Sequence, residues 1–167
     1  MFRWDSVTKL LREPKLGAEV GVRAGRFTSR LLRDHPTLTM YAVDSWCPRP
    51  ASPGAESYSG YDWASIIQEF HRVTAPFAGR IILLHMDSSE AARHVQDGSL
   101  DFCFIDADHS YEGVSRDIDA WAPKVRKGGI LSGHDYGHPR FPGVARAVDE
   151  RFKVNLAPDN VWWMRRC

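Results

Sequence analysis

The chain has 167 residues, of which 43% are hydrophobic and 26% charged, with a formal net charge of +1. This length fits one domain, residues 1–167, built around one core. The near-zero charge gives no electrostatic case for nucleic acid or a membrane surface as partner. No apolar run approaches the roughly 20 residues that cross a bilayer, and the first residues do not lead into a signal-peptide core. We therefore expect a cytoplasmic protein with neither partner.

Short β-rich runs alternate with helical patterns along the chain, which is typical of βαβ units and a largely parallel sheet. The expected helices cover residues 5–12, 26–34, 63–73, 110–125 and 143–152, with a short one opening at Ser88, and the expected strands cover residues 16–22, 39–44, 80–84, 100–105, 130–133, 153–156 and 161–165. Residues 127–129 are expected to turn into the fifth strand. Five strand–helix units followed by an antiparallel hairpin predict a seven-stranded, doubly wound, Rossmann-like α/β fold.

Residues 46–60 form the one long segment without a periodic pattern, and they are rich in Pro, Ser and Gly. Such segments in compact domains tend to be lids or binding loops, or else disordered, so a flexible loop or lid is expected here. Tyr58, Tyr61 and Trp63 could stack on a sugar or aryl ring, or pack in the core instead.

Ligands of doubly wound sheets bind at the carboxyl ends of the strands, which directs attention to the residues after each strand. After the first strand comes the pattern Glu19-x-Gly21-x-x-x-Gly25. Glycine lets the backbone turn sharply and approach a ligand closely, and the next helix presents its N-terminal amides there. A plain tight turn explains this pattern equally well.

Polar residues also follow the second and third strands. Asp44 lies about 20 residues after the glycine turn, the spacing of a carboxylate that binds a ribose diol. As a lone aspartate it would more often be a helix cap or a turn residue. Asp87 and Ser88 could hydrogen-bond an adenine edge, cap the following helix, or do both.

The densest polar cluster follows the fourth and fifth strands. Asp106 and His109 come after a nearly all-apolar run, and His134 and Asp135 follow the next strand. Because these strands would be neighbours, Asp106 and Asp135 could face each other across a few Å. Carboxylates with an imidazole suit a divalent cation, although a hydrogen-bonded polar strip without metal is the alternative.

Together these residues resemble class I S-adenosylmethionine-dependent methyltransferases, and more narrowly the small bacterial branch whose fourth strand ends in Ile-Asp-x-Asp-His-x-Tyr and whose fifth ends in His-Asp. The resemblance covers residues 15–136. The residues that carry it are Glu19, Gly21, Gly25, Asp44, Asp87-Ser88, the run 104–113 and the run 128–136.

The resemblance implies specific roles in binding S-adenosylmethionine. Its methionine part would contact Glu19, Gly21 and Gly25, while the ribose and adenine sites would include Asp44, Ser45, Asp87 and Ser88, with Asp106 also near the cofactor. Metal-dependent O-methyltransferases of this kind imply Mg or Mn at Asp106, His134 and Asp135. In the catechol type a lysine base stands three residues after the strand-four aspartate, the position of His109 here, so His109 and Asp106 are the predicted catalytic residues.

The expected reaction is methylation of a hydroxyl on a small molecule such as a sugar, a phenol or a secondary metabolite. Histidine at position 134 departs from the carboxylate or amide of the metal-dependent relatives, which puts magnesium in doubt. The chain also lacks their long N-terminal extension, so the site could be open, closed by residues 46–60, or completed by a second subunit in a homodimer. A nicotinamide-dependent oxidoreductase should show Gly-x-Gly-x-x-Gly, whereas these glycines are spaced by four. A binding or scaffold protein of the same fold is the third alternative.

Overall fold

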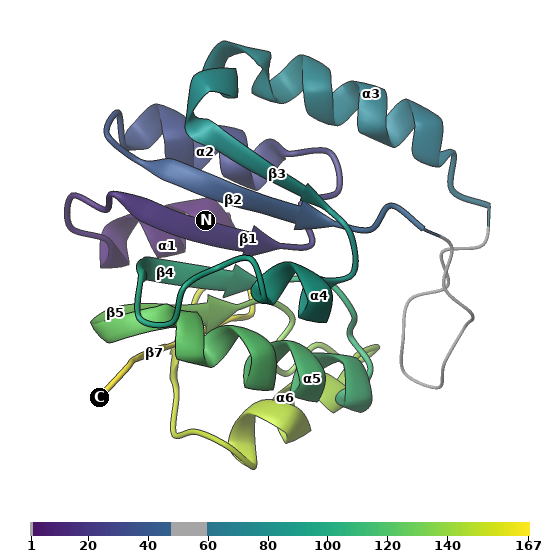
Figure 1. Ribbon diagram of the computed structural model, residues 1–167. Helices are drawn as coiled ribbons and strands as arrows, with labels where there is room; N and C mark the ends of the chain where they lie inside the picture. Colours follow the sequence, from purple (N-terminus) through teal and green to yellow (C-terminus); the bar gives the residue numbers. More distant parts are fainter. Residues whose placement is uncertain (1, 48–59) are drawn as a thin grey trace.

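The computed structural model describes residues 2–47 and 60–167, in which seven strands form a single sheet (Figure 1). The strands are β1 Leu16–Val20, β2 Thr39–Asp44, β3 Ile81–His85, β4 Leu100–Ile105, β5 Val125–Gly133, β6 Asn155–Ala157 and β7 Val161–Arg165. Their order is β3-β2-β1-β4-β5-β7-β6. The first five run parallel, and β7 runs antiparallel to β5 and β6. The predicted doubly wound sheet with a terminal hairpin is confirmed.

Helices cover both faces of this sheet (Figure 1). They are α1 Arg3–Leu10, α2 Arg26–Asp34, α3 Trp63–Thr74, α4 Ser88–Ala92, α5 Tyr111–Trp121 and α6 Pro142–Asp149, with 3-10 turns η1 Ala75–Arg80 and η2 Ala122–Lys124. Side-chain caps fix where three of them begin: Asp62, Asp87 and Ser110 each accept a hydrogen bond from a backbone amide of the first turn. These three helices, α3, α4 and α5, therefore begin within one residue of their predicted positions.

Strand β4 divides the core into two layers, because successive side chains of a strand point to opposite faces. On one face Phe104 stacks on Phe27 of α2, with ring centroids 4.2 Å apart. On the other face Cys103 and Ile105 pack with residues of α4, α5 and α6. With both faces covered, the strand is apolar along nearly its whole length, as the sequence indicated.

Strand β5 is longer than predicted. It begins at Val125, so the expectation that residues 127–129 form a turn ahead of a strand at 130–133 is wrong. The pairing with β4 shifts register between Leu100 and Phe102, and Gly128 has a left-handed φ of 75°. The amide of Gly128 donates to the carbonyl of Arg166 (2.7 Å). The glycines therefore form an irregularity within a strand that is paired near the chain end.

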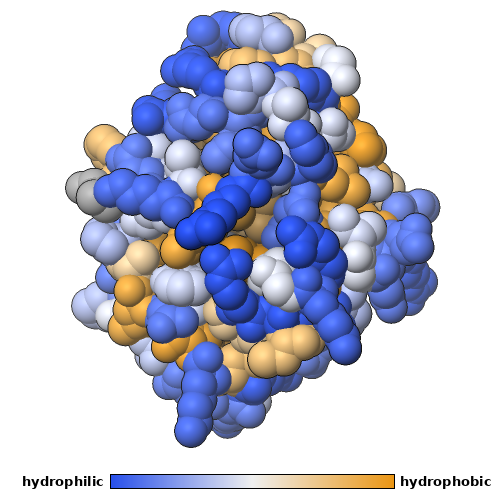
Figure 2. All heavy atoms as spheres, turned by 90° about the vertical axis from the view of Figure 1, so that its left-hand side faces the viewer, coloured by the Kyte–Doolittle hydropathy of each residue, from blue (hydrophilic) through white to orange (hydrophobic). Residues whose placement is uncertain are grey.

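The carboxyl ends of β1, β2, β4 and β5 meet along one edge of the sheet, where the strand order reverses beside β1. Figure 2 shows the side of the molecule that bears the amino ends of these strands, where the surface is mostly hydrophilic with scattered hydrophobic groups. The predicted lid lies largely outside the described residues, because only 46, 47 and 60 of its span are described. Within the described part of the chain, the helices are too short and polar to span a bilayer.

Candidate active site

The glycine turn, which connects β1 to α2, packs against the end of β4. Gly21 has a φ of +95°, and a Cβ at this position would lie 2.2 Å from the carbonyl oxygen of Asp106. Gly25 also has a positive φ, and a Cβ there would lie 2.8 Å from Phe70 and from Thr74 of α3. Glycine is therefore required at both positions, since a side chain would clash and the backbone conformation is left-handed.

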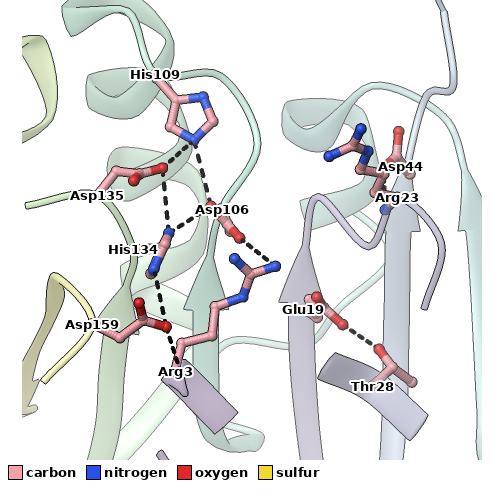
Figure 3. A network of polar contacts seen from close by, with 10 residues as sticks. All are labelled: Arg3, Glu19, Arg23, Thr28, Asp44, Asp106, His109, His134, Asp135 and Asp159. Atoms are coloured by element: carbon pink, nitrogen blue, oxygen red, sulfur yellow. Dashed lines mark hydrogen bonds and ion pairs between the residues drawn. The ribbon is translucent and has the colours of Figure 1, made fainter. Parts of the chain in front are cut away.

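Glu19 is a buried carboxyl at the end of β1, with 1% of its surface exposed. Its side chain accepts a hydrogen bond from the Thr28 hydroxyl (Figure 3). Burial raises the pKa of Glu19 to about 8, although the bond from Thr28 and the charge of Arg3 oppose the shift. A buried acid beside a cavity is poised to ionise when a cationic group arrives.

Asp44 holds the loop after β2 against the glycine turn. One of its oxygens accepts the Arg23 amide and the other accepts the Trp46 amide, both at 2.8 Å. The Trp46 indole in turn donates to the Arg23 carbonyl at 2.9 Å. Asp44 also lines the cavity described below. The turn-residue and ligand-binding interpretations of Asp44 are thus compatible.

The residues after β3 have mainly structural contacts. Asp87 accepts the Ser89 amide at 2.9 Å and caps α4. The Ser88 hydroxyl donates to Asp117, while Ser88 also lines the cavity described below. The capping alternative that the sequence left open therefore holds for Asp87, and the adenine contact stays a prediction.

Four polar side chains converge where β4 and β5 end (Figure 3). The Nε2 of His109 lies 2.9 Å from Oδ2 of Asp135 and 3.4 Å from Oδ1 of Asp106. The Nδ1 of His134 lies 3.3 Å from Oδ2 of Asp135 and 3.7 Å from Oδ1 of Asp106. Asp135 reaches this position from a left-handed backbone conformation with φ 59°, a strained state that is typical of functional sites.

Opposite charges set the protonation of this cluster. Burial opposes a charged imidazole, but hydrogen bonds and charge from Asp106 and Asp135 outweigh it and raise the pKa of His109 to about 10. The same carboxylates raise the pKa of His134 against its burial. Burial favours a neutral Asp135, yet the two histidines hold its pKa well below the usual range. His109 is therefore a hydrogen-bond donor in this arrangement.

The cluster also has the geometry of a metal site. One ligand atom from each of Asp106, His134 and Asp135 lies within 4.8 Å of the other two. The Nδ1 of His109 and the Nε2 of His134 are buried without a hydrogen-bond partner among the described residues. Two carboxylates and an imidazole form a donor set that accepts manganese or zinc more readily than a purely oxygen-ligated magnesium site would. These residues fit a divalent cation.

Two site residues were absent from the sequence prediction. Arg3 enters from α1, and its Nη2 lies 3.5 Å from Oδ2 of Asp106. Asp159, in the turn between β6 and β7, accepts the Arg3 backbone amide at 2.7 Å and lies 3.8 Å from Nε2 of His134. Neither residue follows a parallel strand, and no local motif marks it.

A single cavity of about 820 Å³ joins these groups, as far as the described residues define it. The predicted residues that line it are Glu19, Gly21, Asp44, Ser45, Ser88, Asp106, His109, His134 and Asp135. Gly25 and Asp87 do not belong to its lining among the described residues. Trp63 lines it too, and stacks on Tyr61 with ring centroids 5.3 Å apart. One hollow thus connects the glycine turn to the carboxylate–histidine cluster.

Comparison with known proteins agrees with this geometry. A family model described as a methyltransferase domain matches residues 18–136. Among curated proteins, an uncharacterized protein of Sinorhizobium fredii is 25% identical over 124 residues, which is 72% of this chain and 12% of that protein. The chain thus spans only a small part of the curated relative it matches.

Solved structures with the same fold include several O-methyltransferases. NovP matches with a TM-score of 0.68 and 20% identity over 98% of this chain and 76% of its own. An O-methyltransferase family protein from Burkholderia thailandensis gives 0.65 and 16%, over 98% of this chain and 55% of its own. CalS11, a TDP-rhamnose 3'-O-methyltransferase of calicheamicin biosynthesis, gives 0.61 and 18%, over 91% and 71%. At these identities the likeness shows the fold.

Proposed function

Because the chain belongs to the methyltransferase domain family, we propose that it transfers the methyl group of S-adenosylmethionine to a hydroxyl oxygen of a small molecule. The observation that carries this proposal is the single cavity, with buried Glu19 at one side and the Asp106–His109–His134–Asp135 cluster at the other. The fold that this chain shares with O-methyltransferases supports oxygen as the acceptor atom.

The residues of the glycine turn fit the cofactor. Glu19 offers a buried carboxylate to the ammonium of the methionine part, and Gly21 leaves the backbone open beside it. Asp44 and Ser45 line the same cavity on the side of β2, where a ribose diol would find hydrogen-bond acceptors. S-adenosylmethionine supplies the electrophilic methyl carbon. These side chains would hold the cofactor, and alignment of its methyl carbon with the acceptor is a large part of catalysis.

At the other side of the cavity, Asp106, His134 and Asp135 would hold the cation. A divalent ion at these ligands would stabilise the negative charge of a deprotonated acceptor oxygen. His109 takes the acceptor proton at Nε2, the nitrogen that faces the carboxylates. The ring must be neutral for this, which requires the carboxylates to be compensated by another positive charge, because they otherwise keep His109 protonated.

Removal of divalent cations is expected to abolish turnover. S-adenosylhomocysteine formation would be measured with a panel of sugar and phenol acceptors after exhaustive chelation, and then after return of Mn²⁺ or Mg²⁺. Asp135→Asn is expected to weaken activation by Mn²⁺ at least about tenfold, because one anionic ligand is lost. The matched control is Asp97→Asn, since Asp97 pairs with Lys124 at the surface, outside the cavity.

Turnover that survives chelation would remove the metal from the proposal and leave methyl transfer standing.

The only partner in this proposal is a small-molecule acceptor. A homodimer that completes the site stays a prediction, testable by light scattering. A scaffold protein that kept the fold without chemistry would bind no cofactor, and the buried carboxyl of Glu19 beside an open cavity argues against it.

A further inference from the structure

The amino-acid end of S-adenosylmethionine is a zwitterion, with an ammonium and a carboxylate on the same carbon. Glu19 can pair only with the ammonium, since the Glu19 carboxylate and the cofactor carboxylate are both negative. The carboxylate needs a cationic or N–H donor within a few Å of Glu19, because an anion placed in a partly buried cavity without a partner is costly.

Most cationic side chains of the cavity have other neighbours. The Arg23 guanidinium lies over the Tyr61 ring, 5.0 Å from its centroid, and the Arg140 guanidinium lies 5.5 Å from the centroid of Phe141. Arg26 acts on the pKa of Glu69, which places its charge beside α3. The two histidines of the cluster interact with Asp106 and Asp135.

Arg3 differs from these residues in its position. Its guanidinium lies between Asp106 and Glu19 in Figure 3, and its charge lowers the pKa of Glu19. Its Nε is buried and makes no hydrogen bond within the described part of the chain. The one ion pair that Arg3 makes there, to Asp106, is long at 3.5 Å. The guanidinium therefore keeps donors available beside Glu19.

The backbone that carries Arg3 is well anchored. Its amide donates to Asp159 at 2.7 Å, and the Ser6 hydroxyl donates to the Pro158 carbonyl at 3.2 Å. Val7 is fully buried against α2 and the sheet. A donor on an anchored helix loses little conformational freedom when it binds a ligand, which favours tight binding.

The two oxygens of Asp106, which lines the cavity, have different neighbours. Oδ1 faces His109 and His134, whereas Oδ2 faces Arg3. The two histidines and the guanidinium of Arg3 therefore contact different oxygens of the same carboxylate. Arg3 can serve the cofactor half while the cluster serves the acceptor half.

We propose that Arg3 binds the α-carboxylate of S-adenosylmethionine, opposite the ammonium held by Glu19, so that α1 forms part of the cofactor site. The inference rests on the proposed function. It predicts that Arg3 distinguishes a cofactor that carries the carboxylate from one that lacks it.

Decarboxylated S-adenosylmethionine provides this comparison, because it keeps the sulfonium and the ammonium and lacks the carboxylate. Dissociation constants of both compounds would be measured by calorimetry without added metal. Arg3→Ala is expected to weaken S-adenosylmethionine binding about 10- to 100-fold, the range for a hydrogen bond to a charged group. The affinity for the decarboxylated compound should change less than about threefold, and Arg3→Lys should restore part of the loss for S-adenosylmethionine.

The matched control is Arg30→Ala, since Arg30 forms ion pairs with Asp5 and Asp34 outside the cavity. Its affinities should equal those of the wild type. Equal weakening of both compounds by Arg3→Ala would show that Arg3 only supports Asp106 or the fold, and would overturn the inference. Unchanged binding of both would overturn it too. A wild type that binds neither compound would instead refute the proposed function itself.

Discussion

Replacing His109 by alanine is expected to lower the turnover number by roughly 10²–10⁴-fold, the usual contribution of a general base. The affinity for S-adenosylmethionine should change little, because the ring contacts the carboxylates of the acceptor half and stacks on Phe141. Turnover would be followed as S-adenosylhomocysteine formation with an acceptor identified from the hydroxyl panel. Added imidazole is expected to restore part of the rate.

Two further variants separate chemistry from folding. In the alanine variant Asp106 and Asp135 lose a hydrogen-bond partner, which could disturb the local structure. His109→Gln keeps a polar group next to Asp135 and therefore controls for this effect. His94→Ala removes an exposed imidazole outside the cavity and should behave as the wild type. If both His109 variants turned over at the wild-type rate with intact cofactor affinity, His109 could not be the base.

Glu19→Gln is expected to stabilise the protein at neutral pH while it weakens cofactor binding. In the folded state Glu19 keeps its proton up to about pH 8, whereas the unfolded chain loses it above its ordinary pKa of 4.5. Folding at pH 7 must therefore protonate this group. The free-energy cost is about 1.4 kcal/mol for each pH unit by which the solution lies above the unfolded pKa. Glutamine carries no such penalty, so the variant should gain about 3 kcal/mol at pH 7 and much less near pH 5.

The pH dependence is the diagnostic part of this result. Wild-type stability that depends on Glu19 is greatest below pH 4.5 and is lost as the pH rises through about 8. Urea unfolding at several pH values would measure the difference between wild type and variant, which isolates Glu19 from the histidines. Glu90→Gln, at an exposed position of α4, is the control. The same variant should bind S-adenosylmethionine about 10- to 100-fold more weakly, since it lacks the carboxylate. A less stable variant at pH 7 with full affinity would contradict both roles.

Much of the fold could be predicted because most of the strands have a recognisable local sequence pattern. Strand β4 is apolar at almost every position, which is what burial on both faces demands. The start of β5 could not be found in this way, because Gly128 and Gly129 look like a turn in sequence. Their pairing with Arg166, near the other end of the chain, makes them part of a strand. Pairing between distant segments leaves no periodic signal.

The same distinction applies to the site. Asp106 and Asp135 follow parallel strands, so sheet topology alone places them at one edge, and they come together there as expected. Arg3 reaches the site only because α1 packs on α2. Asp159 comes from a hairpin turn whose position depends on β7 pairing with β5. Both contacts arise from tertiary packing, and a residue-by-residue interpretation cannot detect them.

The central claim is that the cavity beside Glu19 binds S-adenosylmethionine. Calorimetric titration of the purified protein with S-adenosylmethionine, and in parallel with NAD, tests this claim most directly. One S-adenosylmethionine per chain should bind, NAD should not, and Glu19→Gln should weaken the first titration. Binding of NAD in preference to S-adenosylmethionine, or binding of neither compound, would contradict the assignment.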